Sequence, residues 1–152
     1  MKILVLSDSH GDKYSLEKII NKENNTDMII HLGDGLNEFE DIMLNSKITN
    51  YCVAGNCDFE TTAPYSRIIS AAGKRFFIAH GHTFDVKETY SKIIKTAESE
   101  NTDICLFGHT HMQYKSVIND MIMLNPGAVN YFNDYAVIEI NNSNVEISLK
   151  NL

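Results

Sequence analysis

Aspartate, asparagine and histidine side chains come directly after five apolar runs of this sequence, at the point where each run stops. The five endings read LSDSH, HLGD, AGNCD, AHGH and FGHTH, and their candidate ligands are Asp8, His10, Asp34, Asn56, His80, His82, His109 and His111. Five of the six histidines are among these candidates, and the sixth is His31. Ligand sites in open α/β sheets lie outside the carboxyl ends of the strands. If the apolar runs are neighbouring parallel strands, we expect these side chains to converge in one place.

Each motif taken alone has an ordinary structural explanation. An aspartate after a strand usually caps a helix, and Gly33-Asp34 is a common turn sequence. The His109-Thr110-His111 motif is more specific, because alternate residues of an extended backbone point the same way. His31 lies inside an apolar run, which favours a structural role or support of a neighbouring ligand. Independent capping does not predict that nearly all histidines come after apolar runs, so the whole set favours a shared site.

The ligand types in this set favour transition metals. Carboxylate, imidazole and amide oxygen, without a Cys pair at zinc-finger spacing, suit Mn²⁺, Fe²⁺, Zn²⁺ or Ni²⁺ better than Ca²⁺. The candidates are too many for one ion, and one shared aspartate would divide them into two sites. Ions about 3.5–4 Å apart are the arrangement used for in-line displacement at phosphorus. Two divalent ions against two carboxylates leave a positive site that would attract phosphate.

Predicted strands and helices alternate along the first third of the chain, and they would position the first of these residues. We expect strands over residues 1–7, 27–34 and 50–56 and amphipathic helices over 14–23 and 36–44, a pattern that implies parallel pairing.

The remainder has a different pattern. Two strand-like runs joined by Ala72-Gly73-Lys74 predict a hairpin, residues 86–100 predict the longest helix, and residues 103–111 predict another strand. Asn-Asp and Asn-Asn pairs break the C-terminal third into runs typical of a meander of antiparallel hairpins. The predicted fold is α/β (α+β), a four-layer α-β-β-α sandwich of two packed mixed sheets flanked by helices.

Composition narrows the function classes. The 152 residues predict one domain over 1–152, and the net charge of −7 argues against non-specific binding to nucleic acid or anionic membranes. No apolar run approaches the length of a membrane span. Cysteines are odd in number (Cys52, Cys57 and Cys105) and lie in or beside apolar runs, which argues against a disulfide framework and favours a reducing, cytoplasmic location. The apolar segment 121–132 is a candidate homo-oligomer contact, although core strands would have the same pattern.

The ordered motifs resemble those of the calcineurin-like metallophosphoesterase superfamily, and within it the small single-domain phosphodiesterases of the YfcE type. The family pattern is D-x-H, G-D, G-N-[HC]-[DE], H and G-H-x-H, and the chain has all five in that order. They are Asp8-Ser9-His10, Gly33-Asp34, Gly55-Asn56-Cys57-Asp58, His80-Gly81-His82 and Gly108-His109-Thr110-His111. Asn125 to Ala128, NPGA, is similar to the family's NPGS segment.

The resemblance implies an enzyme that hydrolyses phosphate diesters with a hydroxide held between two divalent metal ions, Mn²⁺ foremost and Fe²⁺, Ni²⁺, Zn²⁺ or Mg²⁺ as alternatives. Its ligand roles pass to the positions that match. Asp34 would bridge the two ions. One ion would be bound by Asp8, His10 and His111, and the other by Asn56, His80 and His109.

Cys57 departs from the pattern of many family members, in which a histidine at this position assists the leaving group. A thiol with a pKa of about 8.5 is mostly protonated at pH 7, but it is a weak donor without positive charge. We therefore expect weaker leaving-group assistance, or assistance from His82 or Asp58, and a preference for diesters with acidic leaving groups. Cys57 as a small buried filler is the structural alternative, and no C-x₅-R motif supports a thiolate nucleophile.

Three other functions would use a similar chain. A non-catalytic scaffold like the retromer subunit of this superfamily would not need every ligand position filled. A nuclease would need a basic stripe and aromatic stacking platforms, which the acidic sequence does not indicate. A cyclic-nucleotide phosphodiesterase would differ only in the pocket above the metals.

Overall fold

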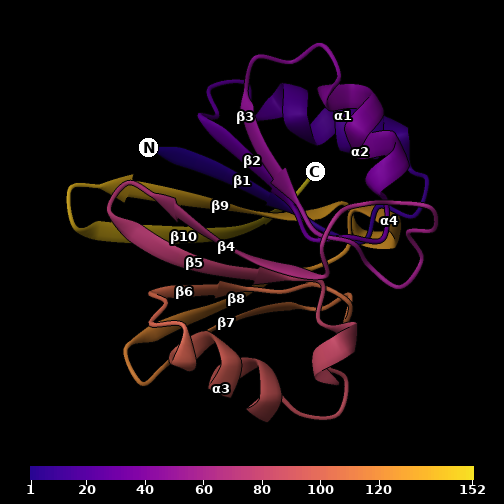
Figure 1. Cartoon of the computed structure of the whole chain (residues 1–152). Coiled ribbons are helices and arrows are strands. Elements are labelled where there is room, and N and C mark those ends of the chain that lie inside the picture. Colours follow the sequence, from indigo (N-terminus) through magenta and orange to yellow (C-terminus); the bar gives the residue numbers. More distant parts are fainter.

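Five strands form the first sheet of the computed structural model, which describes residues 1–152 (Figure 1). The strands are β1 (Lys2–Leu6), β2 (Met28–His31), β3 (Thr49–Cys52), β9 (Asp134–Asn141) and β10 (Asn144–Asn151). Their order is β10-β9-β1-β2-β3, with β1, β2 and β3 parallel and β9 antiparallel to both neighbours. The parallel pairing predicted for the first third is therefore confirmed.

The second sheet is also mixed. Its strands are β4 (Ser66–Ala71), β5 (Lys74–Ala79), β6 (Ile104–Leu106), β7 (Gln113–Ile118) and β8 (Met121–Pro126). Their order is β4-β5-β6-β8-β7, with β5, β6 and β8 parallel. The predicted hairpin is confirmed, because β4 and β5 pair antiparallel across Ala72 and Gly73, which both have positive φ.

Helices cover the outer face of each sheet, as the sequence predicts. Helices α1 (Lys13–Lys22) and α2 (Leu36–Met43) lie on the first sheet and α3 (Ser91–Ser99) on the second, so the layers run helix, sheet, sheet, helix (Figure 1). Helix α1 begins where the Asp12 carboxylate accepts the Ser15 N–H at 3.0 Å, and it buries Leu16 and Ile19 against the sheet.

The main core lies between the sheets. Its aliphatic side chains come from both inner faces, among them Ile3, Val5, Ile30, Ile78, Leu106 and Leu124, all fully buried. Burial on both faces explains why these strands are almost continuously apolar in sequence. The same burial fixes their register, so the positions at which they end are fixed as well.

Two expectations about elements are wrong. The helix expected over residues 86–100 is restricted to α3, which at 9 residues is shorter than α1. Upstream of it the chain forms a short 3₁₀ helix (η1, His82–Phe84) and turns, and the Thr89 hydroxyl accepts the Ser91 N–H. Such local side-chain bonds compete with helix formation.

The antiparallel hairpins expected in the C-terminal third are confirmed as β7–β8 and β9–β10, but they do not form one continuous meander. β7 and β8 pair in the second sheet, but the chain then crosses through a short irregular turn (α4, Val129–Phe132) to β9 in the first sheet. Asn133 and Asp134 therefore mark a crossover between sheets. No helix in the structure is both long enough and apolar enough to cross a membrane.

Candidate metal centre

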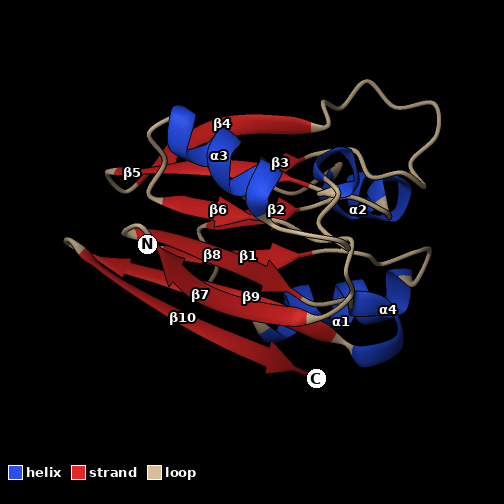
Figure 2. Cartoon of the chain, turned by 90° about the horizontal axis from the view of Figure 1, so that it is seen from below, coloured by secondary structure: helices blue, strands red, loops and turns tan.

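The predicted ligands lie at one end of the sandwich, where the loops after the parallel strands gather (Figure 2). Backbone bonds join the first two loops, because Asp8 N–H donates to Gly33 O at 3.0 Å and His10 N–H to Asp34 O at 2.9 Å. A third bond joins Gly108 N–H to His80 O at 2.9 Å in the other sheet. The strand ends of both sheets therefore present their side chains to one volume.

The first ligand group consists of Asp8, His10 and His111, whose ligand atoms lie within 4.8 Å of one another. His111 Nε2 is 3.2 Å from Asp8 Oδ1 and 3.3 Å from His10 Nε2. The other carboxylate oxygen, Asp8 Oδ2, accepts from the Ser7 hydroxyl at 2.5 Å and from His109 N–H at 3.0 Å. Asp8 Oδ1 is buried and lacks a hydrogen-bond partner, and a metal ion would satisfy it.

The second ligand group consists of Asp34, His80 and His109. His80 Nε2 lies 3.3 Å from Asp34 Oδ2 and 3.1 Å from His109 Nδ1. His80 Nδ1 lies 2.8 Å from Leu32 O, so Nδ1 carries the proton and Nε2 is left as the ligand atom.

Asp34 connects the two groups. Asp34 Oδ2 is 3.3 Å from His80 in the second group and 3.8 Å from His10 in the first, while Oδ1 accepts Cys57 N–H at 2.7 Å. Asp34 and Cys57 also form a third potential ligand group with His10. A carboxylate between two sets of imidazoles has the position that a bridging ligand requires.

Asn56 differs from the other six predicted ligands. It is exposed, and its Nδ2 donates to Cys57 Sγ at 3.3 Å. The structure therefore brings six of the seven predicted ligands into two groups joined by Asp34. The role of Asn56 as a ligand stays a prediction.

Five of these residues have a backbone that side chains adopt only rarely. Positive φ angles are found at Asp8 (55°), His10 (43°), Asp34 (57°), His109 (68°) and His111 (60°). The two histidines of GHTH therefore point into the site from a turn after β6, and the expectation of an extended segment is wrong. Positive φ outside glycine costs of order 1–3 kcal/mol per residue and clusters at functional sites.

Glycines beside the ligands allow the loops to approach closely. A Cβ on Gly55 would overlap the Asp34 carboxylate, and one on Gly108 would overlap the Ser7 hydroxyl and approach Asp8 Oδ2. Packing therefore explains why the AGNCD and FGHTH endings contain glycine: polar side chains of another loop occupy the space that a Cβ would need.

The charges of the site are strongly coupled. Burial would raise the pKa of Asp8, but His111, His80 and Ser7 outweigh it and lower the pKa. Burial would likewise raise the pKa of Asp34, and His80 reverses that shift. The pKa of His80 is raised, because Asp34 and Asp8 outweigh burial. Burial and the charge of His80 lower the pKa of His109 to about 4, which keeps that imidazole neutral and able to bind a metal.

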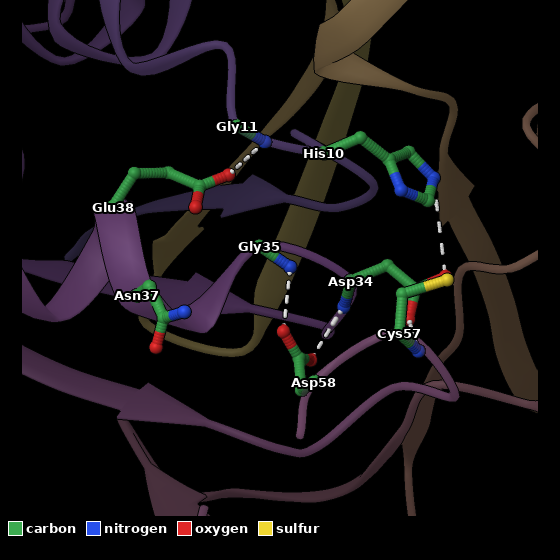
Figure 3. A pocket seen from close by; sticks show the side chains of 8 residues that line it. All are labelled: His10, Gly11, Asp34, Gly35, Asn37, Glu38, Cys57 and Asp58. Carbon is green, nitrogen blue, oxygen red and sulfur yellow. Dashed lines mark hydrogen bonds and ion pairs between the residues drawn. The ribbon is translucent and has the colours of Figure 1, made fainter. Parts of the chain in front are cut away.

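Asp58 holds the backbone of two ligand loops. Its Oδ2 accepts the N–H groups of Asp34 (2.7 Å) and Gly55 (2.8 Å), and its Oδ1 accepts those of Gly35 (2.8 Å) and Leu36 (2.9 Å). Figure 3 shows the bonds from Asp34 and Gly35. Four backbone donors occupy this carboxylate. The arrangement orients Asp34 and the start of α2, and it leaves no lone pair aimed at a leaving group.

Cys57 and His82 are the two remaining catalytic candidates. Cys57 is exposed and lines a cavity of about 370 Å³ together with His10, Asp34 and the start of α2 (Figure 3). Burial and the charge of Asp34 raise the pKa of its thiol, so the thiol is protonated at neutral pH. His82 lies with its ring centroid 5.4 Å from that of His80, and its buried Nδ1 has no hydrogen-bond partner. Burial lowers the pKa of His82.

A hydrogen-bonded chain behind His10 was not predicted from the sequence. Fully buried His31 accepts Gly33 N–H at 3.2 Å and contacts Ser9 Oγ at 3.1 Å, and Ser9 donates to Glu38 at 2.7 Å. Glu38 also accepts Gly11 N–H at 2.7 Å, so both neighbours of His10 are held. Burial lowers the pKa of His31 to about 4, which fits the structural role expected for it. The pairs are 22 to 29 residues apart, and sequence spacing carries no sign of them.

Fold and site together define a class of protein: a two-sheet sandwich that gathers histidines and carboxylates for divalent metals at its strand ends. The chain belongs to the calcineurin-like phosphoesterase superfamily, because the family profile with the description "Calcineurin-like phosphoesterase superfamily domain" matches residues 1–143. The resemblance drawn from the five motifs is thereby confirmed.

Relatives and solved structures agree with this assignment. The chain is 32% identical to the probable metallophosphoesterase YsnB of Bacillus subtilis, over 85% of this chain and 75% of the relative. It is 25% identical to the phosphodiesterase YfcE of Escherichia coli, over 85% and 79%. The structure of Vps29 complexed with zinc from Entamoeba histolytica superposes with a TM-score of 0.79 over 99% and 97% of the two chains, and at 17% identity this shows a shared fold alone.

Proposed function

We propose that this chain is a metal-dependent phosphodiesterase that uses two divalent ions. The observation that carries the proposal is the pair of ligand groups, Asp8-His10-His111 and Asp34-His80-His109, joined by Asp34 Oδ2. The unpartnered, buried Asp8 Oδ1 supports a cation at the first group. The YfcE relative, named a phosphodiesterase, supports the reaction class.

Bound divalent ions supply Lewis acidity toward the phosphoryl oxygens and lower the pKa of bound water toward neutrality. Hydrogen bonds within the chain orient the side chains that would bind these ions. Ser7 and the His109 N–H hold one oxygen of Asp8, and Cys57 N–H holds one oxygen of Asp34, so each carboxylate has its other oxygen directed at the imidazoles. Leu32 O fixes the tautomer of His80. We assign Asn56 to the second group through its amide oxygen.

We further propose that diesters with acidic leaving groups are the preferred substrates. The cavity beside the site has room for an ester group and carries the Cys57 thiol on its wall. A neutral thiol donates a proton poorly to a leaving alkoxide. Asp58 acts through the loops it holds, because its oxygens accept four backbone N–H groups. His82 is then the remaining candidate for proton transfer.

The test is hydrolysis of bis(4-nitrophenyl) phosphate and 4-nitrophenyl phosphate by protein reconstituted with Mn²⁺, compared with chelated protein and with Asp34→Asn. We expect hydrolysis of the diester to exceed that of the monoester, and both to be lost on chelation and in Asp34→Asn. Full activity in Asp34→Asn, or without metal, would overturn the two-ion mechanism. Stoichiometric metal binding without hydrolysis of either ester would favour the scaffold alternative.

A further inference from the structure

Tyr131 is a large aromatic side chain left exposed at the rim of the first ligand group. It is 72% exposed, and its ring lies 6.2 Å from the ring of His111 at an interplanar angle of 27°. This distance and near-parallel orientation are those of an offset stack. Because His111 is a predicted ligand, one side of the Tyr131 ring borders the centre and most of the ring is free to contact another molecule.

The backbone holds this ring in an unusual conformation. Tyr131 has φ 69° and ψ −47°, a combination that non-glycine residues avoid at a cost of order 1–3 kcal/mol. Its N–H donates to the Asn130 side chain at 2.9 Å, and Asn133 N–H closes the turn on Val129 O at 3.0 Å. This strained turn keeps the Tyr131 side chain exposed at the rim of the site, and we take this as support for a role of the ring at that position.

The turn that carries Tyr131 is attached directly to the strand end that carries Asp8. Val129 N–H donates to Ser7 O at 3.0 Å, and Asn130 N–H donates to Asp8 O at 3.2 Å. Val129 itself is fully buried. The position of the Tyr131 ring relative to the Asp8 carboxylate is therefore set by two backbone bonds and a core residue.

Neighbouring exposed aromatics do not share this geometry. Phe132 is 57% exposed and its ring contacts the Tyr131 ring, with centroids 6.4 Å apart. Tyr65, on the other side of the site, meets His82 edge-on at 82° and 5.1 Å. Among these, Tyr131 is the residue whose ring runs nearly parallel to a ligand imidazole.

We propose that Tyr131 forms a stacking subsite for a planar aromatic group of the phosphate ester, and so helps to determine specificity. The inference rests on the proposed function, because it requires the phosphate to be held at the adjacent centre. Base–aromatic stacking is sequence-tolerant and contributes binding through the π face alone. An aryl ring and a nucleobase share this chemistry. Alkyl esters of the same charge lack the planar face and are the disfavoured class.

The test measures binding by calorimetry, so it does not depend on turnover. Protein reconstituted with Mn²⁺ is titrated with phenyl phosphate and methyl phosphate, and in a second arm with adenosine 5′-monophosphate and ribose 5-phosphate. In at least one pair, we expect the wild type to bind the aromatic phosphate about tenfold more tightly than its non-aromatic partner, which is the gain expected for one stacked ring. A preference confined to the first arm assigns the subsite to small aryl groups, and one in the second arm assigns it to nucleobases.

Four variants distinguish an effect of the Tyr131 ring on binding from an effect of altering the turn that carries it. Tyr131→Ala and Tyr131→Leu should bind both members of each pair equally, whereas Tyr131→Phe should retain the preference. Phe132→Ala is the matched control and should also retain it. Unchanged preference in Tyr131→Ala and Tyr131→Leu, or an equal loss in Phe132→Ala, would overturn the subsite alone. Absence of binding of all four phosphates to the wild type would also overturn the subsite, whereas the proposed function is judged separately by metal-dependent hydrolysis of the diester.

Discussion

The two carboxylate oxygens of Asp8 have different roles, and so do those of Asp34. In both residues one oxygen accepts hydrogen bonds from the chain, and the other faces imidazole nitrogens. The bonded oxygen fixes the side chain before a ligand arrives, which lowers the entropy cost of binding a cation. The same division occurs at His80, where Nδ1 is held by Leu32 O and Nε2 faces Asp34 and His109 in the site.

Asp58→Asn tests the carboxylate that holds two ligand loops. The substitution replaces one carboxylate oxygen with an amide NH₂. The two backbone N–H groups that donate to this oxygen in the wild type then lose their acceptor. Each buried donor left without a partner costs about 1–3 kcal/mol, so for two donors we expect a loss of about 2–6 kcal/mol in the free energy of unfolding. Urea denaturation measures it. Glu60→Gln, an exposed carboxylate two residues away, should change the free energy by less than about 0.5 kcal/mol. Equal effects of the two changes would contradict the role of Asp58.

Cys57→His tests whether the thiol sets the choice of ester. An imidazole at this position would protonate a poor leaving group, and positioned proton transfer is worth roughly 10²–10⁴-fold. We expect the rate on alkyl esters, whose leaving alkoxide is strongly basic, to rise at least about tenfold relative to the rate on the 4-nitrophenyl diester. Steady-state kinetics on the matched esters measures this ratio. Cys57→Ala is the control and should leave the ratio near that of the wild type. A ratio unchanged in Cys57→His would show that the thiol does not set specificity.

At the scale of elements, the sequence predicts the buried strands well, together with the polar residues directly after them. Continuous burial makes β1, β2 and β6 recognisable, and the residues after them are predicted ligands that the structure groups together. Helix α3 is shorter than predicted. The Thr89 hydroxyl and the Asp85 carbonyl accept backbone N–H groups in turns before the helix, and the apolar periodicity of the sequence gives no sign of these bonds. Supports such as Ser9 with Glu38 were missed, since that contact joins residues 29 apart.

Gly108→Ala tests the close approach of the β6 loop to the end of β1. The added Cβ would overlap the Ser7 hydroxyl and displace Asp8, so we expect metal affinity to fall by at least about tenfold, together with a loss of about 1–3 kcal/mol in stability. Titration calorimetry with Mn²⁺ measures the affinity. Gly73→Ala, in the β4–β5 hairpin, is the control: its Cβ would meet no atom within 4 Å, although its φ is +74°. It should lose stability only. Unchanged metal affinity in Gly108→Ala would refute the packing argument.

At the scale of the whole molecule, the ligands come from both sheets. Asp8, His10 and Asp34 lie after strands of the first sheet, whereas His80, His109 and His111 lie after strands of the second. The first and the second ligand group each contain residues from both sheets, so the two-group centre forms only when the sheets are packed. Sequence order predicts the ligand set, but which side chains share a group depends on this packing.

An ion-pair cluster around the buried Glu23 on the first sheet links stability to pH. Glu23, at the end of α1, contacts Lys2 of β1 (2.6 Å), Lys150 of β10 (3.0 Å) and the Tyr135 hydroxyl of β9 (3.0 Å). Burial would raise the pKa of Glu23, but hydrogen bonds from Lys2, Lys150 and Tyr135 outweigh it and lower the pKa to about 2, from 4.5. The cluster therefore joins one helix to three strands.

Because the folded-state pKa is depressed, this stabilisation is present above about pH 4.5 and is lost as the pH falls toward 2. At about 1.4 kcal/mol per pKa unit, we expect Glu23→Gln to lower the free energy of unfolding by up to about 3 kcal/mol at pH 7, and by much less near pH 2.5. Urea denaturation at both pH values measures the difference. Glu17→Gln, exposed on the same helix, should show little effect at either pH. A Glu23→Gln deficit that stays constant from pH 7 to pH 2.5 would show that the side chain stabilises the sheet by its packing and hydrogen bonds, independently of its charge.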